Sequence, residues 1–402
     1  MVRISGTLLV MVAVMEAAMT SAGYAQNYPE PVPLARTAAA PYAPPSIWPG
    51  FGPTSAPAGP PGAPGVYPPA PPNIPNGRPG LPEYWEEPLG SYGKYDYYLG
   101  VGWFGLKRQR NDRQDLFVRD PVSSDDNRPP PPDAPVIATT RIPDPNFQSG
   151  VRWTFGLVED AAAWEFAGFV LPNHTTNVTL TNPGRISGLF FNPPTGFENI
   201  FDNADRVRFS FRHQLYNLEG NYHWASSPSG AGFDYLVGVR YVDLQERYAL
   251  LVEDNSIQVG PDPAETATYS TRTHNHMIGG SLGLGARMPI MEWFGVSWFL
   301  RGSWFANRAD IDVELVRQDG LLGTRGSSST WRFSHMYEIN VAAELYLGTF
   351  CRIKGGYNLL WLLDVAEAAN QVSLDLSNPR GRRSFGGDIF YHGPSVEVEF
   401  NF

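Results

Sequence analysis

From about residue 95 to the end of the chain, apolar and polar residues alternate with a period of two. Tyr97, Leu99, Val101 and Trp103 share one face, for example, while Gly100 lies on the other. Such alternation is typical of β-strands with one apolar and one polar face. Similar segments recur at roughly 151–157, 164–170, 216–224, 233–241, 278–288, 294–304, 339–345, 353–361 and 396–402. The pattern predicts an all-β, antiparallel protein of about ten strands.

The connections between these segments are alternately short and long. Short ones fall near Asp160, Ser227, Pro289 and Thr349, and long ones at roughly 110–149, 172–205, 252–272, 307–331 and 363–390. Alternation alone would also fit a soluble sandwich or a lipocalin-like barrel. The asymmetry of the loops favours a transmembrane β-barrel with short periplasmic turns and long external loops. With an even number of strands, the barrel domain begins and ends on the periplasmic side.

Seven tryptophans lie either beside the short connections or near the long ones. Three lie beside short turns and four near long loops: Trp164, Trp224 and Trp293, then Trp103, Trp153, Trp304 and Trp361. We expect two aromatic belts, one at each membrane interface, because amphipathic rings prefer that level. The chain also ends on Val398, Phe400 and Phe402 at alternate positions. This ending resembles the signal by which the barrel-assembly machinery recognises its substrates. We therefore expect that machinery to insert the barrel, and outer-membrane lipid to surround it.

The first 90 residues predict two further regions. Residues 1–25 combine Arg3, an apolar run over 8–15 and small residues on either side of Tyr24, which predicts a cleavable signal peptide and export. Residues 26–90 are dominated by Pro, Ala and Gly, which predicts a disordered, polyproline-like linker. Such a linker could make a periplasmic contact. The barrel domain is then 91–402.

Composition agrees with this organisation. Charged residues make up 17% of the chain, against roughly 25% in typical soluble domains, while aromatic residues reach 13% and there are 41 glycines. A net charge of −10 argues against a nucleic-acid partner. The single cysteine, Cys351, excludes an internal disulfide framework and a cysteine-based zinc site. No run of 18 apolar residues predicts a transmembrane helix.

Several motifs resemble the seventh group of β-barrel porins, characteristic of planctomycete bacteria. They lie at 149–156, 218–222, 236–246, 275–280 and 352–361, and the likeness covers most of 93–402. The resemblance implies an outer-membrane barrel, and the family's name implies a porin. The cysteine pairs usual in that family near the short turns are absent here, so the resemblance supports fold and location better than transport.

The polar face of the predicted strands carries charges of both signs. We expect these residues to face the lumen: Arg152, Glu165, Glu219, Asp234, Arg240, Arg287, Arg301, Glu338, Glu344, Arg352, Lys354, Glu397 and Glu399. A ten-stranded barrel is barely wider than one that its own side chains fill. Because unpaired buried charges are costly, an ion-pair network is expected, with Glu344 close to Lys354 across a hairpin. Glycines 279, 283 and 285 would leave room for long side chains. This favours a plugged or narrow lumen.

Candidate chemistry is sparse. Six histidines map toward the external side: His174, His213, His274, His276, His335 and His392. His274 and His276 share a face, an acceptable spacing for a metal pair. Their parity with Ile278 points them outward, however, so rim histidines and no metal site are expected. Asp125-Asp126 and the pair Asp310 and Asp312 are interpreted as solvated loop charges. No catalytic or cofactor motif is recognised.

Three hypotheses follow from the sequence. The first is a structural or surface-display barrel that acts through long external loops. The second is a passive or substrate-selective porin, and the third, more distant, is a surface enzyme. One segment disturbs the pattern, because 206–224 changes its apolar face near His213. A β-bulge is the expected cause.

Overall fold

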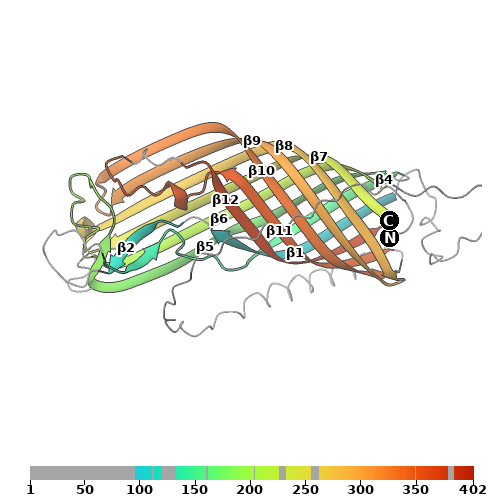
Figure 1. The fold of residues 1–402 in the computed structure, drawn as a ribbon, viewed down its shortest axis with the longest axis horizontal. Coiled ribbons are helices and arrows are strands. Elements are labelled where there is room, and N and C mark those ends of the chain that lie inside the picture. Colours follow the sequence, from blue (N-terminus) through green and yellow to red (C-terminus); the bar gives the residue numbers. More distant parts are fainter. Residues whose placement is uncertain are drawn as a thin grey trace, which may run out of the picture.

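The computed structural model describes residues 96–110, 113–119, 133–159, 162–202, 204–225, 232–254, 262–348, 350–378 and 384–402. Ten long strands form a closed antiparallel barrel (Figure 1). They are β1 (Asp96–Arg110), β4 (Gln148–Glu159), β5 (Ala162–Gly188), β6 (Ala204–Ala225), β7 (Gly232–Glu253), β8 (Thr266–Met291), β9 (Phe294–Arg317), β10 (Leu322–Leu347), β11 (Cys351–Val365) and β12 (Gly387–Asn401). The predicted fold class is confirmed. The predicted signal peptide and linker lie outside the described residues.

The barrel closes between its first and last strands. On one side β1 pairs with β12, where Val101 is opposite Val398 and Leu99 is opposite Phe400. On the other side β1 pairs with β4. The C-terminus lies at the end of the barrel where β1 begins (Figure 1), and Phe402 donates a backbone hydrogen bond of 2.8 Å to Tyr97. This is also the end of the short turns, such as Glu292–Trp293 between β8 and β9.

The opposite end of the barrel is longer than the sequence predicts. Strand β5 has 27 residues, and β8 and β10 have 26 each. Much of 172–205 and almost all of 307–331 are therefore strand, and the expected long loops there are wrong. The β9–β10 connection is only residues 318–321. The strands β2 (Asp115–Arg119) and β3 (Val136–Thr139) form a small hairpin that pairs with the end of β5.

An exposed apolar surface surrounds the half of the barrel nearest the short turns. We call it the apolar band; its outward residues include Leu99, Phe155, Phe166, Leu218, Tyr235, Val237, Val239, Ile278, Leu282, Leu300, Ile339, Val341, Tyr357 and Val396. Val239 alone is 68% exposed. Beyond the band, outward positions on the same strands become polar, as with Arg308, Asp312 and Arg212. We call this second half of the barrel the extension.

The interior shows the reverse pattern. Along β6, odd-numbered residues face inward without interruption: Asn217 and Asn221 within the band, and Phe209 and Phe211 in the extension. The β6–β7 register runs unbroken from Arg206 to Ala225. The bulge expected near His213 is therefore absent from this pairing. The apolar residues change side because the barrel passes from an apolar to a polar exterior. A register shift does lie beside His213 in the β5–β6 pairing, but the extra residue is on β5, between Leu171 and His174; a second shift follows Thr181.

Two apolar clusters fill the interior. The first, which we call the apolar layer, lies where the band meets the extension and contains Phe104, Leu106, Phe169, Leu171, Leu215, Val242, Leu244, Met277, Phe305, Met336, Leu360, Leu362, Val365, Ile389 and Tyr391. Its members come from nine of the ten barrel strands. The second cluster fills the extension and includes Phe117, Phe197, Phe209, Phe211, Leu250 and Leu315. The interior of the extension is a packed core.

Part of the β11–β12 connection folds into that core. Residues 366–376, the inserted segment, contain the 3-10 turn Ala369–Gln371 and are almost entirely buried. Asn275 of β8 donates to the carbonyl of Ala366 and accepts from its amide, both at 2.9 Å. Thr271 donates to the carbonyl of Ala368 at 2.6 Å. The segment is thus tied to the inner wall by backbone hydrogen bonds.

Among the described residues, no helix has the length and hydropathy to cross a membrane.

Candidate functional site

A cavity of about 740 Å³ occupies the lumen within the apolar band. All thirteen charged residues that the sequence assigns to the lumen line it. The lining reaches the short-turn end at Gly232, Gly348 and Asn401, and the apolar layer at Phe104 and Leu360. Inward-facing Asp234 and Arg287 keep side-chain exposures of 44% and 45%. The cavity is therefore open toward the short turns and ends at the apolar layer.

One group of charges lies directly beneath the apolar layer. The guanidinium of Arg240 on β7 spans the lumen to Glu338 on β10, with one contact of 3.1 Å. Arg301 on β9 pairs with Glu219 on β6 and lies 3.8 Å from Glu338. Arg240 also donates to Asn217. The Arg240–Glu338 and Arg301–Glu219 pairs join strands that are not neighbours in the sheet, so these two pairs cross the lumen.

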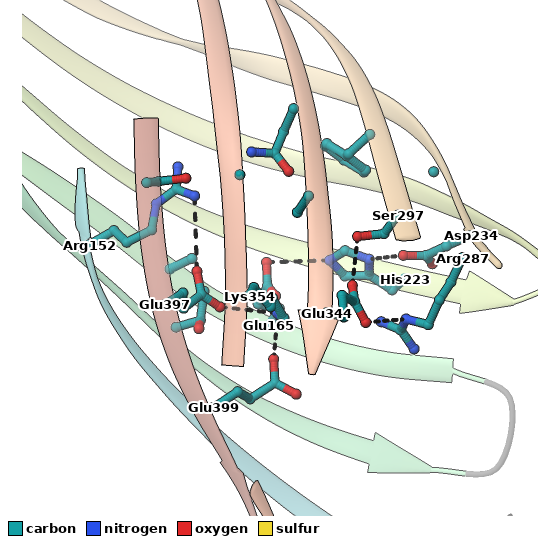
Figure 2. A pocket seen from close by; sticks show the side chains of 18 of the residues that line it. Arg152, Glu165, His223, Asp234, Arg287, Ser297, Glu344, Lys354, Glu397 and Glu399 are labelled. Atoms are coloured by element: carbon teal, nitrogen blue, oxygen red, sulfur yellow. Dashed lines mark hydrogen bonds and ion pairs between the residues drawn. The ribbon is translucent and has the colours of Figure 1, made fainter. Parts of the chain in front are cut away.

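A second group lies nearer the short turns (Figure 2). Lys354 contacts Glu397 at 3.0 Å and Glu399 at 2.6 Å. Lys354 is opposite Glu344 in the register, as expected, but its ion pairs are with these two carboxylates of β12. Glu344 is instead paired with Arg352 at 3.1 Å and Arg287 at 3.2 Å. Glu344 and Lys354 thus lie close across the hairpin as expected, while the ion pairs of each are with other residues.

A third group is centred on His223, which the sequence analysis did not assign to the site. Its Nδ1 lies 3.1 Å from Asp234, and its Nε2 lies 3.3 Å from Glu165 (Figure 2). Tyr98 donates to Glu165 at 2.8 Å, and Asn221 donates to it at 3.1 Å. The parity of His223 with Glu219 and Asn221 was the signal that could have placed it in the lumen.

The glycine stripe on β8 is filled by an aromatic ring. A Cβ at Gly283 would lie 2.7 Å from Phe299, and one at Gly285 would lie 3.0 Å from it. The guanidinium of Arg301 lies 5.1 Å from the centre of this ring. The space that the glycines leave thus holds a ring that supports a lumen arginine through a cation–π contact.

The network is close to neutral and fully paired. Six of the thirteen residues are basic and seven are acidic. Eleven of them have a partner of opposite charge within 4.0 Å, and Glu165 and Asp234 share the imidazole of His223. Arg152, the loosest of them, lies 3.9 Å from Glu397 (Figure 2). A solute entering from the short turns would meet paired charges and then the apolar layer.

A buried ion triad lies beyond the apolar layer. Arg108 on β1 contacts Glu246 on β7 at 2.8 Å and Glu367 of the inserted segment at 2.7 Å. Arg108 is completely buried. Burial alone would lower the pKa of Arg108, but the charges of Glu246 and Glu367 outweigh it and raise the pKa above its ordinary value. The triad is not evident in the sequence, because its members are far apart in the chain.

The external histidines divide into two sets. His213 is 1% exposed and faces inward, beside Phe211 and Tyr391, so its assignment to the rim is wrong. His274 and His276 face outward as expected, with Asp243 beside them. Asp310 and Asp312 lie on β9 rather than in a loop, while Asp125 and Asp126 lie outside the described residues.

The tryptophans of the expected belts are also placed. Trp164, Trp224 and Trp293 are 63%, 41% and 57% exposed near the short turns. Trp304 and Trp361 are exposed at the other edge of the apolar band, while Trp103 and Trp153 are partly covered. Trp331, which the sequence analysis omitted, is exposed on β10 beyond that edge. Val398 and Phe400 pair with β1, and Phe402 ends the chain at the short-turn end.

Known proteins resemble this chain in fold rather than in sequence. The sequence matches no family model and no curated protein. Among solved structures, the chain is similar to the outer membrane protease OmpT from Escherichia coli, with 11% identity over 76% of this chain and 97% of that one, at a TM-score of 0.42. It is similar to the toluene transporter TodX from P. putida, with 10% identity over 76% and 89% and a TM-score of 0.30. A major outer membrane protein from Thermus thermophilus shares 9% identity over 77% and 100%, at a TM-score of 0.30. At such values these likenesses carry no argument about function.

Proposed function

We propose that this chain is a bacterial outer-membrane barrel with a sealed lumen, which holds its extension beyond the outer leaflet as a structural or surface-display element. Support for the location begins with the apolar band. Outward side chains such as Val239, Ile278 and Leu282 are between 55% and 68% exposed. Large continuous apolar surfaces are rare on soluble proteins, and lipid is the surrounding that this one fits.

The charges of the outer surface support the orientation. Outward positions of β6, β7 and β8 beyond the band carry Arg212, Arg247 and Arg272, all exposed. Such residues belong in water or among headgroups, so the extension lies outside the lipid. The short turns, and the first and last residues of the barrel domain, then face the periplasm. From there the linker could make its periplasmic contact, and the barrel-assembly machinery would have inserted the chain through its terminal strand.

The single observation that carries the sealed lumen is the apolar layer. Side chains from nine strands meet there, and each is at most 7% exposed. Above the layer, the inserted segment and a second apolar cluster fill the extension. An ion crossing this region would lose its hydration without gaining a polar partner, which is very costly. The barrel should therefore not conduct, and its contacts with other molecules should be made by the extension.

Single-channel recording of the refolded full chain in a planar bilayer tests this proposal. Folding is checked first, by heat-dependent mobility in gels, and a general porin refolded in the same way is the positive control. We expect no discrete conductance steps from heat-modifiable protein. Steps that change when Arg240 or Arg301 is replaced would overturn the sealed lumen and favour a porin, the function that the resemblance to the planctomycete group implies.

The surface enzyme remains the more distant alternative. This hypothesis predicts that the barrel has an enzymatic activity. The activity should be lost when an outward histidine or aspartate of the extension is replaced, while the barrel still folds. His274 opposite Asp310 is the pair to replace first, because the two residues share the outer face of β8 and β9. Activity toward surface peptides or lipids that survives this double replacement would remove the pair from consideration.

A further inference from the structure

A compact group of metal-binding side chains lies on the outer face of β7 and β8, just beyond the apolar band. His274 and His276 occupy alternate positions on β8, and Asp243 lies directly opposite His276 on β7. The two imidazoles and the carboxylate each offer one donor atom, and these atoms lie within 4.8 Å of one another. The group lies outside the lumen and takes no part in the charge network there.

Three polar groups converge on one carboxylate oxygen. Oδ2 of Asp243 lies 2.9 Å from Nε2 of His274 and 2.9 Å from Nδ1 of His276. The hydroxyl of Tyr241 is 3.2 Å from the same oxygen and 3.1 Å from Nδ1 of His276. Three donors crowd an oxygen with two lone pairs, which is more than a simple hydrogen-bonded cluster needs.

The two imidazole rings are also unusually close. Their centroids are 3.6 Å apart, whereas aromatic pairs prefer about 4.5–7 Å. The two rings are therefore held side by side on the outer face, with a nitrogen atom of each directed at the carboxylate of Asp243.

Geometry and supporting contacts are those of a first-row metal site. Bonds of about 2.0–2.1 Å in a tetrahedron separate neighbouring donors by roughly 3.3 Å, so an opening of a few tenths of an ångström from 2.9 Å would admit the ion. Gln245 donates to the other oxygen of Asp243 at 3.0 Å and orients the carboxylate, as outer-shell groups of metal sites do.

We propose that Asp243, His274 and His276 form a surface site for a divalent transition-metal ion of borderline softness, such as Zn²⁺. Two imidazoles and one carboxylate suit such an ion better than Ca²⁺ or Mg²⁺, which prefer oxygen ligands. Water or the Tyr241 hydroxyl would supply the fourth ligand. The side chains of His274 and His276 are 30% and 36% exposed, so the ion can enter from solution.

The test is a Zn²⁺ titration of the refolded full chain, followed by calorimetry and by competition with a chromophoric chelator. We expect one ion per chain, and binding weakened about tenfold or more by Asp243→Asn or His276→Ala. Co²⁺ in place of Zn²⁺ should give visible absorption bands of a tetrahedral centre with nitrogen ligands. His392→Ala is the matched control, because His392 is another outward histidine whose side-chain contacts are with Gln109 and Tyr357, neither of them acidic.

Heat-dependent gel mobility confirms that each variant folds before its binding is compared. The proposal would be overturned if one ion per chain did not bind at about 100 µM Zn²⁺. This concentration is well above the dissociation constant expected of a three-ligand site. So would equal binding by the wild type and the His274→Ala, His276→Ala double variant, since the ion would then bind elsewhere. Equal losses from His392→Ala and His276→Ala would point to unspecific histidine binding and would also reject the site.

Discussion

The guanidinium of Arg108 on β1 lies 2.8 Å from the carboxylate of Glu246 on β7, although β4, β5 and β6 separate these two strands in the barrel wall. Both side chains are completely buried, and Glu367 of the inserted segment completes the triad. A charge in such a place requires its partner, because the apolar surroundings offer no water. The triad thus links two non-neighbouring strands and the inserted segment above the apolar layer.

Replacing Arg108 by Met should destabilise the barrel by about 3–5 kcal/mol, because two buried carboxylates lose the cation that pairs with both of them. The free energy of unfolding is measured by urea titration of the protein in lipid vesicles, with tryptophan fluorescence as the signal. Lys107→Met is the control. Lys107 pairs with Asp144 at 3.1 Å, but the two side chains are 31% and 71% exposed, so the change should be within about 1 kcal/mol. Equal stabilities of the two variants would contradict a dry triad.

Truncating the apolar layer should be equally costly. Phe305 is 1% exposed and packs within the layer, so Phe305→Ala should cost about 3–5 kcal/mol. Phe333→Ala on the neighbouring strand removes an aromatic ring that is 61% exposed on the outer face, and should cost about 0.5 kcal/mol. Urea titrations of both variants supply the comparison. A cost for Phe305→Ala no larger than that for Phe333→Ala would mean that the layer is loosely packed, which would weaken the case for a seal.

The alternation of residues, together with the alternately short and long connections, predicted the barrel, its strand number and the lining of its lumen. Period-two patterning assigns each residue to a face, and Arg240, Glu338 and their neighbours share the inward parity that places them in the cavity. Their partners could not be predicted, since the distance from Arg240 to Glu338 depends on the curvature of the barrel.

The extension was missed for a physical reason. Within the apolar band Tyr216 and Leu218 face outward, whereas further along β6 Phe209 and Phe211 face inward. The period of two continues, but the apolar residues move to the other parity where the apolar outer surface gives way to a polar one. On sequence alone, such a change is indistinguishable from a bulge or from the start of a loop. The triad and Asp243 were missed because they depend on contacts between distant segments.

The inserted segment should depend on Asn275. This side chain is completely buried and satisfies both backbone groups of Ala366. Asn275→Ala leaves an amide and a carbonyl without partners, which should cost about 2–4 kcal/mol. Hydrogen exchange of peptides that cover residues 366–376 should accelerate in the same variant. Asn173→Ala, which removes an exposed amide that contacts Arg212, is the control. If exchange in 366–376 were unchanged in Asn275→Ala, the segment would be held by its apolar contacts alone.

Tyr269 should make the stability of the extension sensitive to alkaline pH. Burial raises the pKa of Tyr269 to about 12, despite a hydrogen bond of 3.1 Å from the Ser373 amide that favours the phenolate. In the unfolded chain the pKa of a tyrosine is about 10. Between these values the unfolded chain has lost the proton that the folded protein keeps, so stability falls as pH rises from about 10 to about 12. The full loss, for a shift of about two units, is about 3 kcal/mol.

Tyr269→Phe isolates this contribution. Below pH 10 the variant should be less stable than the wild type by about 1 kcal/mol, because the Ser373 amide loses its acceptor. Above about pH 11 the order should reverse, since phenylalanine has no proton to lose. Urea titrations at about pH 8, 10 and 11.5 measure the difference between the two proteins, which cancels the titration of the other tyrosines. Parallel pH profiles would mean that Tyr269 ionises as freely in the folded barrel as in the unfolded chain, and that water reaches the core of the extension.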